Sequence, residues 1–363
     1  MNKPIRQRIC SLYSTGLIVI AMLLAGCAEQ ARVLHFKIPD NSNPDTVWPS
    51  PPAKPRFAYI GDLTGETNLE NVNDQAKAGV SSFLEILAGV GLDKDLPVVL
   101  RRPQSGMVDS AGRIFVTDVG GGSIFVFDEV QGKLEVWDRF SIDKPFLQPI
   151  GIVEGEGGHV LVVDAEYGMV IELTAAGEFV RTFGGGTFQR PTGIARDPVS
   201  GRIFVADTHA HHIKVFSADG TLVDVWGSKG DKPGQFNSPV YLSLYHGSLY
   251  ITDTLNARIQ VMSLDGDVQN VFGQRGLWIG NLVRPKGVSL DSDGNIYIVE
   301  SYYDHLLVYN QQGELLLPIG GAGKNAGRFF LPTGTWSDSR DRIYVADMMN
   351  GRVSIFQYLG SDQ

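Results

Sequence analysis

Apolar strands that end in an acidic residue recur along the chain from residue 102 onward. Examples are IFVAD, LYITD and IYVAD, and successive terminal acids lie 43 to 47 residues apart. These acids are Asp118, Asp164, Asp207, Asp253, Glu300 and Asp347. A nearly constant period of this length indicates one structural unit per repeat, so the pattern predicts six units.

Each repeat carries the signals of four short strands. It opens with a proline step and a short apolar segment, as in RPTGIARD, and the strand that ends in the acid follows. A turn, an alternating strand such as HIKVFS, a polar-glycine turn and a fourth strand such as TLVDVWG come next. Six such units over residues 102–358 predict an all-β fold, a six-bladed β-propeller.

The sixth repeat lacks its fourth strand. After RVSIFQY, which ends at Tyr358, LGSDQ (residues 359–363) remains as a tail. An unassigned strand, RFAYIGDL, lies upstream of the repeats. We expect its residues 57–63 to pair as the outer strand of the last blade, which would close the ring and cover an open edge.

A helical pattern interrupts the β-rich part of the sequence before the first repeat. In residues 73–92, apolar side chains recur at spacings of three and four, which predicts one short amphipathic helix. Its apolar face either caps one end of the propeller, or docks a partner or dips into a membrane. Both interpretations stay open.

The N-terminal residues have the pattern of an exported protein. Residues 1–26 begin with the basic run MNKPIRQR and continue as an apolar stretch, which is typical of a secretory signal peptide. An uncleaved membrane anchor is the alternative. Residues 28–56 contain six prolines and little apolar periodicity, which predicts a semi-rigid tether before the body of the protein.

Charge and cysteine content narrow the possible partners. The net charge is −9, and clustered Lys and Arg are what nucleic acid requires, so we expect no nucleic-acid partner. The two cysteines are Cys10, inside the leader, and Cys27. The mature chain therefore has no pair for an intrachain disulfide and relies on its packed core.

The tetrapeptide LAGC, which ends at Cys27, resembles the lipobox of bacterial lipoproteins. The resemblance implies that the Cys27 thiol receives a diacylglyceryl group and becomes the new N-terminus of the lipidated segment 27–56. Two or more acyl chains give durable membrane attachment. By the same resemblance, Ala28 after the cysteine favours the outer membrane.

The repeat cores DTLNARIQVM and DMMNGRVSIF resemble the D-x-x-N-x-R-[IV] core of NHL repeats. The resemblance covers residues 102–358 and is weaker in the first, second and fifth repeats. It implies a structural role for the six terminal acids, which would accept backbone N–H bonds, and for Arg258 and Arg352. His212 occupies the position of that arginine in the third repeat.

Related six-bladed propellers include metal-dependent lactonases and a zinc-dependent amidating lyase, which bind metal at the central channel. The strands expected to line the channel here, such as TGIARD and KGVSLD, contain no histidine. His209 and His211 are the weak metal candidates, with His246 or His305 as a third ligand. A polar turn with incidental histidines is the alternative. No metal or other cofactor is therefore assigned.

Aromatic residues near the expected ends of the channel form a candidate partner surface. They are Tyr241, Tyr245, Tyr302, Tyr303 and Trp336. Such rings recognise proteins, peptides or glycans, although packing inside the fold is the alternative use. No nucleophilic catalytic motif of the G-x-S-x-G type is present.

These observations predict a lipid-anchored, non-enzymatic binding or scaffold module of the outer membrane, with an envelope protein as its partner. The alternative from another class is a metal-dependent hydrolase or lyase of the six-bladed type. A cluster of three or four ligands at the mouth of the channel would favour this enzyme.

Overall fold

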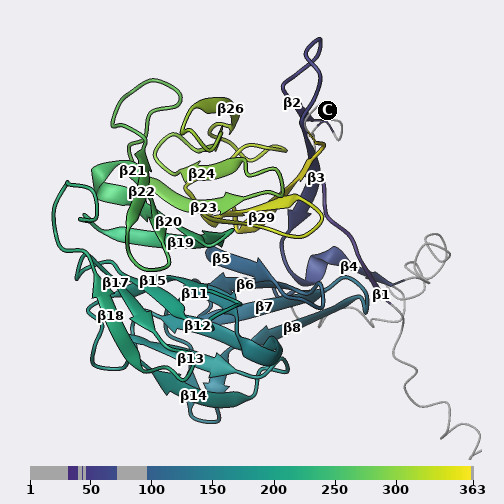
Figure 1. Cartoon of the computed structure of the whole chain (residues 1–363). Coiled ribbons are helices and arrows are strands. Elements are labelled where there is room, and N and C mark those ends of the chain that lie inside the picture. Colours follow the sequence, from purple (N-terminus) through teal and green to yellow (C-terminus); the bar gives the residue numbers. More distant parts are fainter. Residues whose placement is uncertain (1–31, 40–42, 44–45, 72–95, 361–363) are drawn as a thin grey trace, which may run out of the picture.

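The computed structural model describes residues 32–39, 43, 46–71 and 96–360. The chain forms six antiparallel sheets arranged as blades around a central axis (Figure 1), which confirms the six-bladed β-propeller predicted from the repeat. The helix expected at residues 73–92, Cys27 and the signal peptide lie outside the described residues.

The first three blades each contain four strands in sequence order from the axis outward. Blade 1 consists of β5 (Pro103–Val108), β6 (Ile114–Asp118), β7 (Ser123–Asp128) and β8 (Lys133–Trp137). Blade 2 consists of β11 (Pro149–Glu154), β12 (Val160–Asp164), β13 (Met169–Leu173) and β14 (Phe179–Phe183). Blade 3 consists of β15 (Pro191–Arg196), β16 (Ile203–Asp207), β17 (His212–Phe216) and β18 (Leu222–Trp226).

The next two blades repeat this order, and the last has a different outer edge. Blade 4 consists of β19 (Pro239–Tyr245), β20 (Ser248–Asp253), β21 (Arg258–Ser263) and β22 (Val268–Phe272). Blade 5 consists of β23 (Pro285–Leu290), β24 (Ile296–Glu300), β25 (His305–Tyr309) and β26 (Leu315–Gly320). Blade 6 consists of β27 (Pro332–Ser337), β28 (Arg342–Asp347), β29 (Arg352–Tyr358), β3 (Phe57–Leu63) and β2 (Val47–Trp48).

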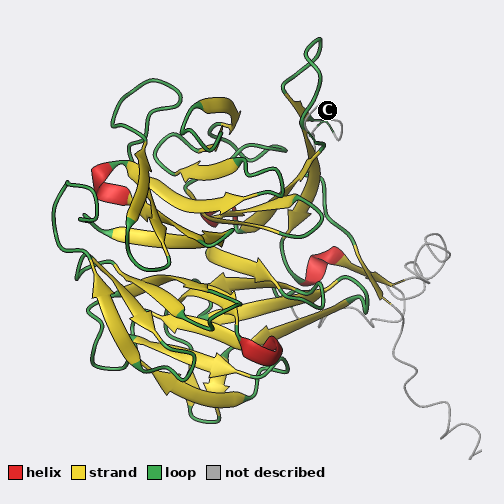
Figure 2. Cartoon of the chain, in the orientation of Figure 1, coloured by secondary structure: helices red, strands yellow, loops and turns green. Residues whose placement is uncertain are grey.

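The remaining elements of the described residues are short. The strands are β1 (Arg32–Leu34), which pairs with β4 (Leu69–Asn71), and β9 (Arg139–Ser141), which pairs with β10 (Lys144–Pro145). The helical segments are single turns (Figure 2). They are η1 (Glu66–Asn68), η3 (Glu156–Gly158), η4 (Thr254–Asn256) and η5 (Met348–Asn350).

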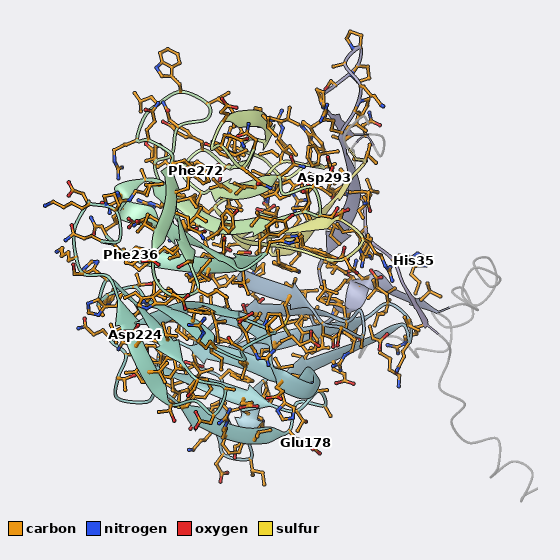
Figure 3. The ribbon with its side chains drawn as sticks, in the orientation of Figure 1. His35, Glu178, Asp224, Phe236, Phe272 and Asp293 are labelled. Carbon is orange, nitrogen blue, oxygen red and sulfur yellow. The ribbon has the colours of Figure 1, made fainter. Side chains whose placement is uncertain are left out.

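The core lies between the blades. Strand β16 is buried on both faces because it packs against a neighbouring blade on each side, whereas four of the five residues of the outer strand β18 are exposed. Each of the six apolar clusters joins two adjacent blades. Phe236 and Phe272 lie in such clusters, whereas Glu178 projects at the outer edge (Figure 3). A single blade could not bury these faces, so stability depends on ring closure.

The upstream strand closes the ring, as expected. Strand β3 pairs antiparallel with β29, from Val353 opposite Leu63 to Tyr358 opposite Phe57. The last blade thus takes its outer strands from a segment about 290 residues upstream of β29.

The prediction of a tether at residues 27–56 is wrong for the part of this segment that the structure describes. Strand β1 pairs with β4, and β2 extends blade 6 beyond β3. The Trp48 ring lies 5.5 Å from the ring of Phe356, so the proline-rich residues 49–55 link two paired strands and do not form a spacer. Val47 and Trp48 are too few to show a periodic pattern in the sequence. They form a strand because the open edge of β3 offers backbone hydrogen-bond partners. Within the described residues, no helix has the length and apolar character needed to cross a membrane.

Candidate functional site

The central channel and its two ends are the candidate site. The innermost strands of adjacent blades contact one another around the axis. They all begin at one end of the molecule, where the terminal acids, the turns after them and the links between blades also lie. We call this end the connection face, and the opposite end, with the other hairpin turns, the turn face.

The terminal acids hold the links that lead into the innermost strands. The Asp164 carboxylate accepts hydrogen bonds from the backbone N–H groups of Leu147 and Gln148, at 2.8 and 3.1 Å. Glu300 receives equivalent bonds from Val283 and Arg284. The other four acids, Asp118, Asp207, Asp253 and Asp347, also accept at least one backbone N–H bond from the link before their own blade. All six are buried, so these bonds replace water around the carboxylates.

The cations that pair with these acids come from two sequence positions. Arg258 and Arg352 each place Nε 2.8 Å from the acid of their own blade, Asp253 and Asp347. In blade 3 the partner of Asp207 is Lys214, whose Nζ lies 3.1 Å from Oδ2. His212, at the equivalent position of the arginine, does not supply this charge. A long side chain two residues further along the same strand face reaches the acid instead.

The histidines proposed as metal ligands are dispersed. His209 is exposed in the turn after β16, and the Nδ1 atom of His211 accepts a hydrogen bond from the Ser238 N–H at 3.0 Å. His246 lies on the turn face, and His305 in blade 5 bonds the Tyr303 carbonyl. Burial and the Lys229 cation hold the pKa of His211 below its usual value. In the described part of the chain, no group of three or more His, Cys, Asp or Glu side chains has a metal-binding arrangement.

The five aromatic residues do not form one surface, which corrects the partner surface expected from the sequence. Tyr241 and Trp336 lie inside the channel, and Tyr245 follows them toward the turn face. Tyr302 and Tyr303 lie in the turn after β24, on the connection face, with their rings edge to face at 4.9 Å. Tyr241, Tyr245 and Trp336 belong to innermost strands, which run toward the turn face. Tyr302 and Tyr303 follow a second strand, which runs the opposite way and ends at the connection face. The repeat pattern alone did not separate these two groups.

The Tyr241 side chain closes the neck of the channel. Its hydroxyl lies 2.8 Å from the Ser105 hydroxyl of blade 1 and donates to the Thr335 carbonyl of blade 6 at 3.0 Å. The side chain therefore starts in blade 4 and crosses the axis to the opposite side of the ring. Burial raises the pKa of Tyr241 to about 12, so the hydroxyl stays protonated and able to donate.

Glycines at the same level make this arrangement possible. The third residue of the innermost strand is Tyr241 in blade 4 and Ser105 in blade 1, and in the other blades it is Gly151, Gly193, Gly287 and Gly334. A Cβ atom on any of these four glycines would overlap the backbone of the next innermost strand. The strands thus approach closely at the neck, and one large side chain fills the remaining space. In an alignment of the six repeats, Tyr241 is the one large residue at this position.

A blind cavity lies between Tyr241 and the turn face. Its volume is about 740 Å³, and its walls come from the innermost strands of all six blades. Its mouth is formed by the turn after β15, which includes Asp197, Pro198 and Val199, together with His246 and Gly247. Trp336 contributes to its wall and stacks on Tyr344, with ring centroids 5.4 Å apart and planes 2° apart. Sequence reasoning placed aromatic rings near the channel but did not find this cavity.

Comparison with known proteins supports the repeat assignment. The NHL repeat model matches residues 188–216, which span the first three strands of blade 3. The chain carries an NHL repeat. Two curated relatives are the peptidyl-glycine alpha-amidating monooxygenases A and B of Xenopus laevis, 33% and 31% identical over 113 residues. These matches cover 27% of this chain and 12% and 13% of the relatives, so the chain spans about an eighth of their length.

Solved structures share the fold at low sequence identity. A streptogramin B lyase is 16% identical, with a TM-score of 0.54 over 72% of this chain and 95% of its own. An auxiliary nutrient binding protein from Bacteroides thetaiotaomicron is 11% identical, with a TM-score of 0.58 over 72% and 70%. A gluconolactonase from Xanthomonas campestris is 12% identical, with a TM-score of 0.54 over 72% and 89%. Lyases, a lactonase and a binding protein share this architecture, so the fold alone does not assign a function.

Proposed function

We propose that this protein is a non-enzymatic binding module of the bacterial cell envelope, anchored by lipid at Cys27, that docks a protein partner on its connection face. The observation that carries the proposal is an apolar tip in the link between β22 and β23. Its three consecutive residues, Leu277, Trp278 and Ile279, are 82%, 81% and 66% exposed. Exposed apolar clusters of this kind mark interaction sites, and tryptophan is enriched among the residues that dominate binding energy.

The base of this link is held in place, although its tip is exposed. The Arg275 guanidinium donates to the Leu255 carbonyl at 2.8 Å, and the Tyr309 hydroxyl donates to the Gly280 carbonyl at 2.7 Å. Leu277 and Ile279 also border a small hollow with Tyr303. A link fixed on both sides presents its tip with less ordering cost on binding than a free loop would.

Further exposed apolar side chains lie on the same face. They come from turns and links of blades 4, 5 and 6 and are Leu255, Tyr302, Phe330 and Met349. With residues 277–279 they form an arc around half of the connection face. From the expected aromatic set, we include Tyr302 in this proposed surface.

The position of the N-terminal segment is compatible with anchoring and docking at the same time. Arg32 lies against the turn between β7 and β8 of blade 1, where a Cβ on Gly132 would overlap the Arg32 carbonyl. Cys27 precedes Arg32 by five residues, which span at most about 18 Å. Blade 1 is opposite blade 4 in the ring, and β1 and the tip lie on opposite sides of the molecule (Figure 1). A lipid at Cys27 would therefore hold blade 1 near the bilayer and leave the apolar tip facing away from it.

Site-specific photocrosslinking in cells tests the docking surface. A photoreactive amino acid at position 278 is expected to give one dominant protein adduct, and replacing Leu277 and Ile279 with serine in that variant is expected to reduce its yield at least fivefold. The matched control is the same amino acid at Val199, which is 93% exposed on the turn face. Equal adducts from positions 278 and 199, or none from 278, would contradict the proposal.

The lipid anchor is tested by Cys27→Ser. We expect the wild-type protein to fractionate with the outer membrane and to carry a thioether-linked diacylglyceryl group by mass spectrometry, because the thiol is the acceptor. The serine variant is expected to lose this lipid and to leave the outer-membrane fraction. An unmodified cysteine in the mature wild-type protein would refute the anchor and leave the docking surface to be judged by the crosslinking alone.

A further inference from the structure

We propose that the blind cavity on the turn face binds a small organic anion, with an apolar body inside the cavity and a single acidic head group at Arg196. The inference goes beyond the proposed docking function, because it concerns the opposite face and different residues. It rests on the closure of the channel, the character of the walls and the position of one unpaired cation.

Closure by Tyr241 turns the channel into a container with one opening. Its hydroxyl bonds to blades 1 and 6 fix the floor, and at the same level the glycines of blades 2, 3, 5 and 6 let neighbouring innermost strands approach closely. The volume of about 740 Å³ lies within the range of about 300–1,000 Å³ that ligand pockets occupy. A ligand can therefore enter and leave through the mouth on the turn face.

The walls of the cavity are mainly apolar side chains. They include Met107, Ile152, Ile194, Leu242 and Trp336. Trp336 is fixed by its stacking on Tyr344 and lies so close to Gly106 that a Cβ there would overlap the indole. Such a wall favours a ligand with an apolar, preferably aromatic, body.

Most of the hydroxyl groups in these walls already have partners. The Ser289 and Thr335 hydroxyls lie 3.1 Å apart, and the Ser337 hydroxyl bonds the Leu290 carbonyl. Ser243 lines the cavity and has no hydrogen bond from its side chain to any described residue. The side chains of the cavity walls therefore offer few polar groups to a ligand body.

Arg196 is the exceptional charge of this site. It is the last residue of β15, it is half-buried at the mouth, and its guanidinium has no hydrogen bond or ion pair with any residue that the structure describes. By contrast, Arg113 and Arg342 on the same face pair with Asp109 and Asp338 at 2.8 and 2.6 Å. A half-buried guanidinium with five free donors is suited to a carboxylate or phosphate oxygen pair.

Two neighbouring acids are already occupied by other groups and do not neutralise Arg196. The Asp197 carboxylate accepts bonds from the Val199 and Ser200 N–H groups and from the Ser200 hydroxyl. Burial opposes its ionisation, but these bonds outweigh burial and hold the pKa of Asp197 below its usual value. Glu154 of blade 2 accepts the N–H and the hydroxyl of Ser110. The geometry leaves Arg196 to an external anion.

The test compares two probes that share one body. We expect 1-naphthaleneacetate, titrated by calorimetry into the full chain in detergent, to bind with one site per chain and at least tenfold more tightly than the neutral 1-naphthaleneacetamide. Titrations into detergent alone give the background. In Arg196→Gln, the acid is expected to bind no more tightly than the amide, whereas the amide affinity stays unchanged.

Two further variants locate the site. Ser243→Phe places a ring inside the cavity and is expected to weaken the binding of both probes at least tenfold. If the Ser243→Phe variant does not fold, Ser243→Leu is used in its place. Val223→Ser, on the exposed outer strand β18, is the control and should bind both probes as the wild type does. Competition by 1-naphthyl phosphate then shows whether Arg196 prefers a phosphate or a carboxylate head group.

Several results would overturn the proposal. The proposal fails if neither probe binds at millimolar concentration, or if the wild type binds acid and amide with equal affinity. It also fails if Arg196→Gln still prefers the acid, or if a folded Ser243 variant binds both probes as the wild type does. None of these results bears on crosslinking at position 278, so the two proposals fail separately.

Discussion

Replacing Arg352 with methionine is expected to lower the free energy of unfolding by about 3 to 5 kcal/mol, the cost of breaking a buried ion pair by removing one partner. Arg352 is 5% exposed and lies between two carboxylates from distant parts of the chain. Its Nη1 is 2.8 Å from Asp62 of the closing strand β3, and its Nε is 2.8 Å from Asp347. Without the guanidinium, two buried acids would face each other across the junction that closes the ring.

The pH dependence of this loss has a definite sign. Burial raises the pKa of Asp62, and it raises the pKa of Asp347 from 3.8 to about 6 against the opposing effect of Arg352. Between about pH 4 and 6 the folded chain therefore binds more protons than the unfolded chain. The free energy of unfolding should rise as the pH falls through that window, because protonation of Asp62 and Asp347 favours the folded state. Removing the cation raises both values further, so the loss in Arg352→Met should be largest above pH 7 and smaller at pH 5.

Urea unfolding at pH 7.5 and pH 5, followed by tryptophan fluorescence, measures this effect. The matched comparison is Arg258→Met, the same motif position in blade 4, where the guanidinium pairs with Asp253 alone. We expect a smaller loss there and a weaker pH dependence. A loss in Arg352→Met no greater than in Arg258→Met, or one that grows as the pH falls, would show that Asp62 does not close the ring in this way.

Replacing Gly334 with alanine is expected to cost about 3 kcal/mol, at the upper end of the usual overpacking penalty. A Cβ at this position would overlap the Gln104 carbonyl and approach the Ser105 Cα to 2.9 Å. Both atoms belong to the backbone of β5, so no side chain can move aside, and the first and last blades of the ring would have to separate. Because Ser105 bonds Tyr241, the closure of the channel neck should loosen as well.

Thermal unfolding and chemical denaturation of Gly334→Ala measure the cost, and Gly185→Ala supplies the control. Gly185 has no atom within 4 Å of an added Cβ and does not have a positive φ. Its substitution should change stability by less than about 1 kcal/mol, in the stabilising direction, through the unfolded state. If Gly334→Ala behaves like Gly185→Ala, the contact between β27 and β5 is looser than the glycine geometry indicates.

The sequence by itself determined the architecture of this protein. The period of the terminal acids predicted six blades, because each repeat carries the pattern of one complete blade. The missing strand of the last repeat predicted the role of residues 57–63, because it left one strand edge without a partner. The six terminal acids bind the links before their blades, a role that follows from their place at the end of a strand. Short-range patterns were sufficient for each of these inferences.

The tertiary structure alone decided what lies on the axis and at the two faces. Tyr241 closes the channel because ring closure brings Ser105 and Thr335, 136 and 94 residues away in sequence, within reach of its hydroxyl. Docking of residues 46–56 on blade 6 likewise required the open edge of β3. Adjacent positions on the axis come from different blades, so no period within one repeat specifies which side chains meet there. The cavity, its unpaired arginine and the separation of the aromatic residues between two faces arise from this convergence.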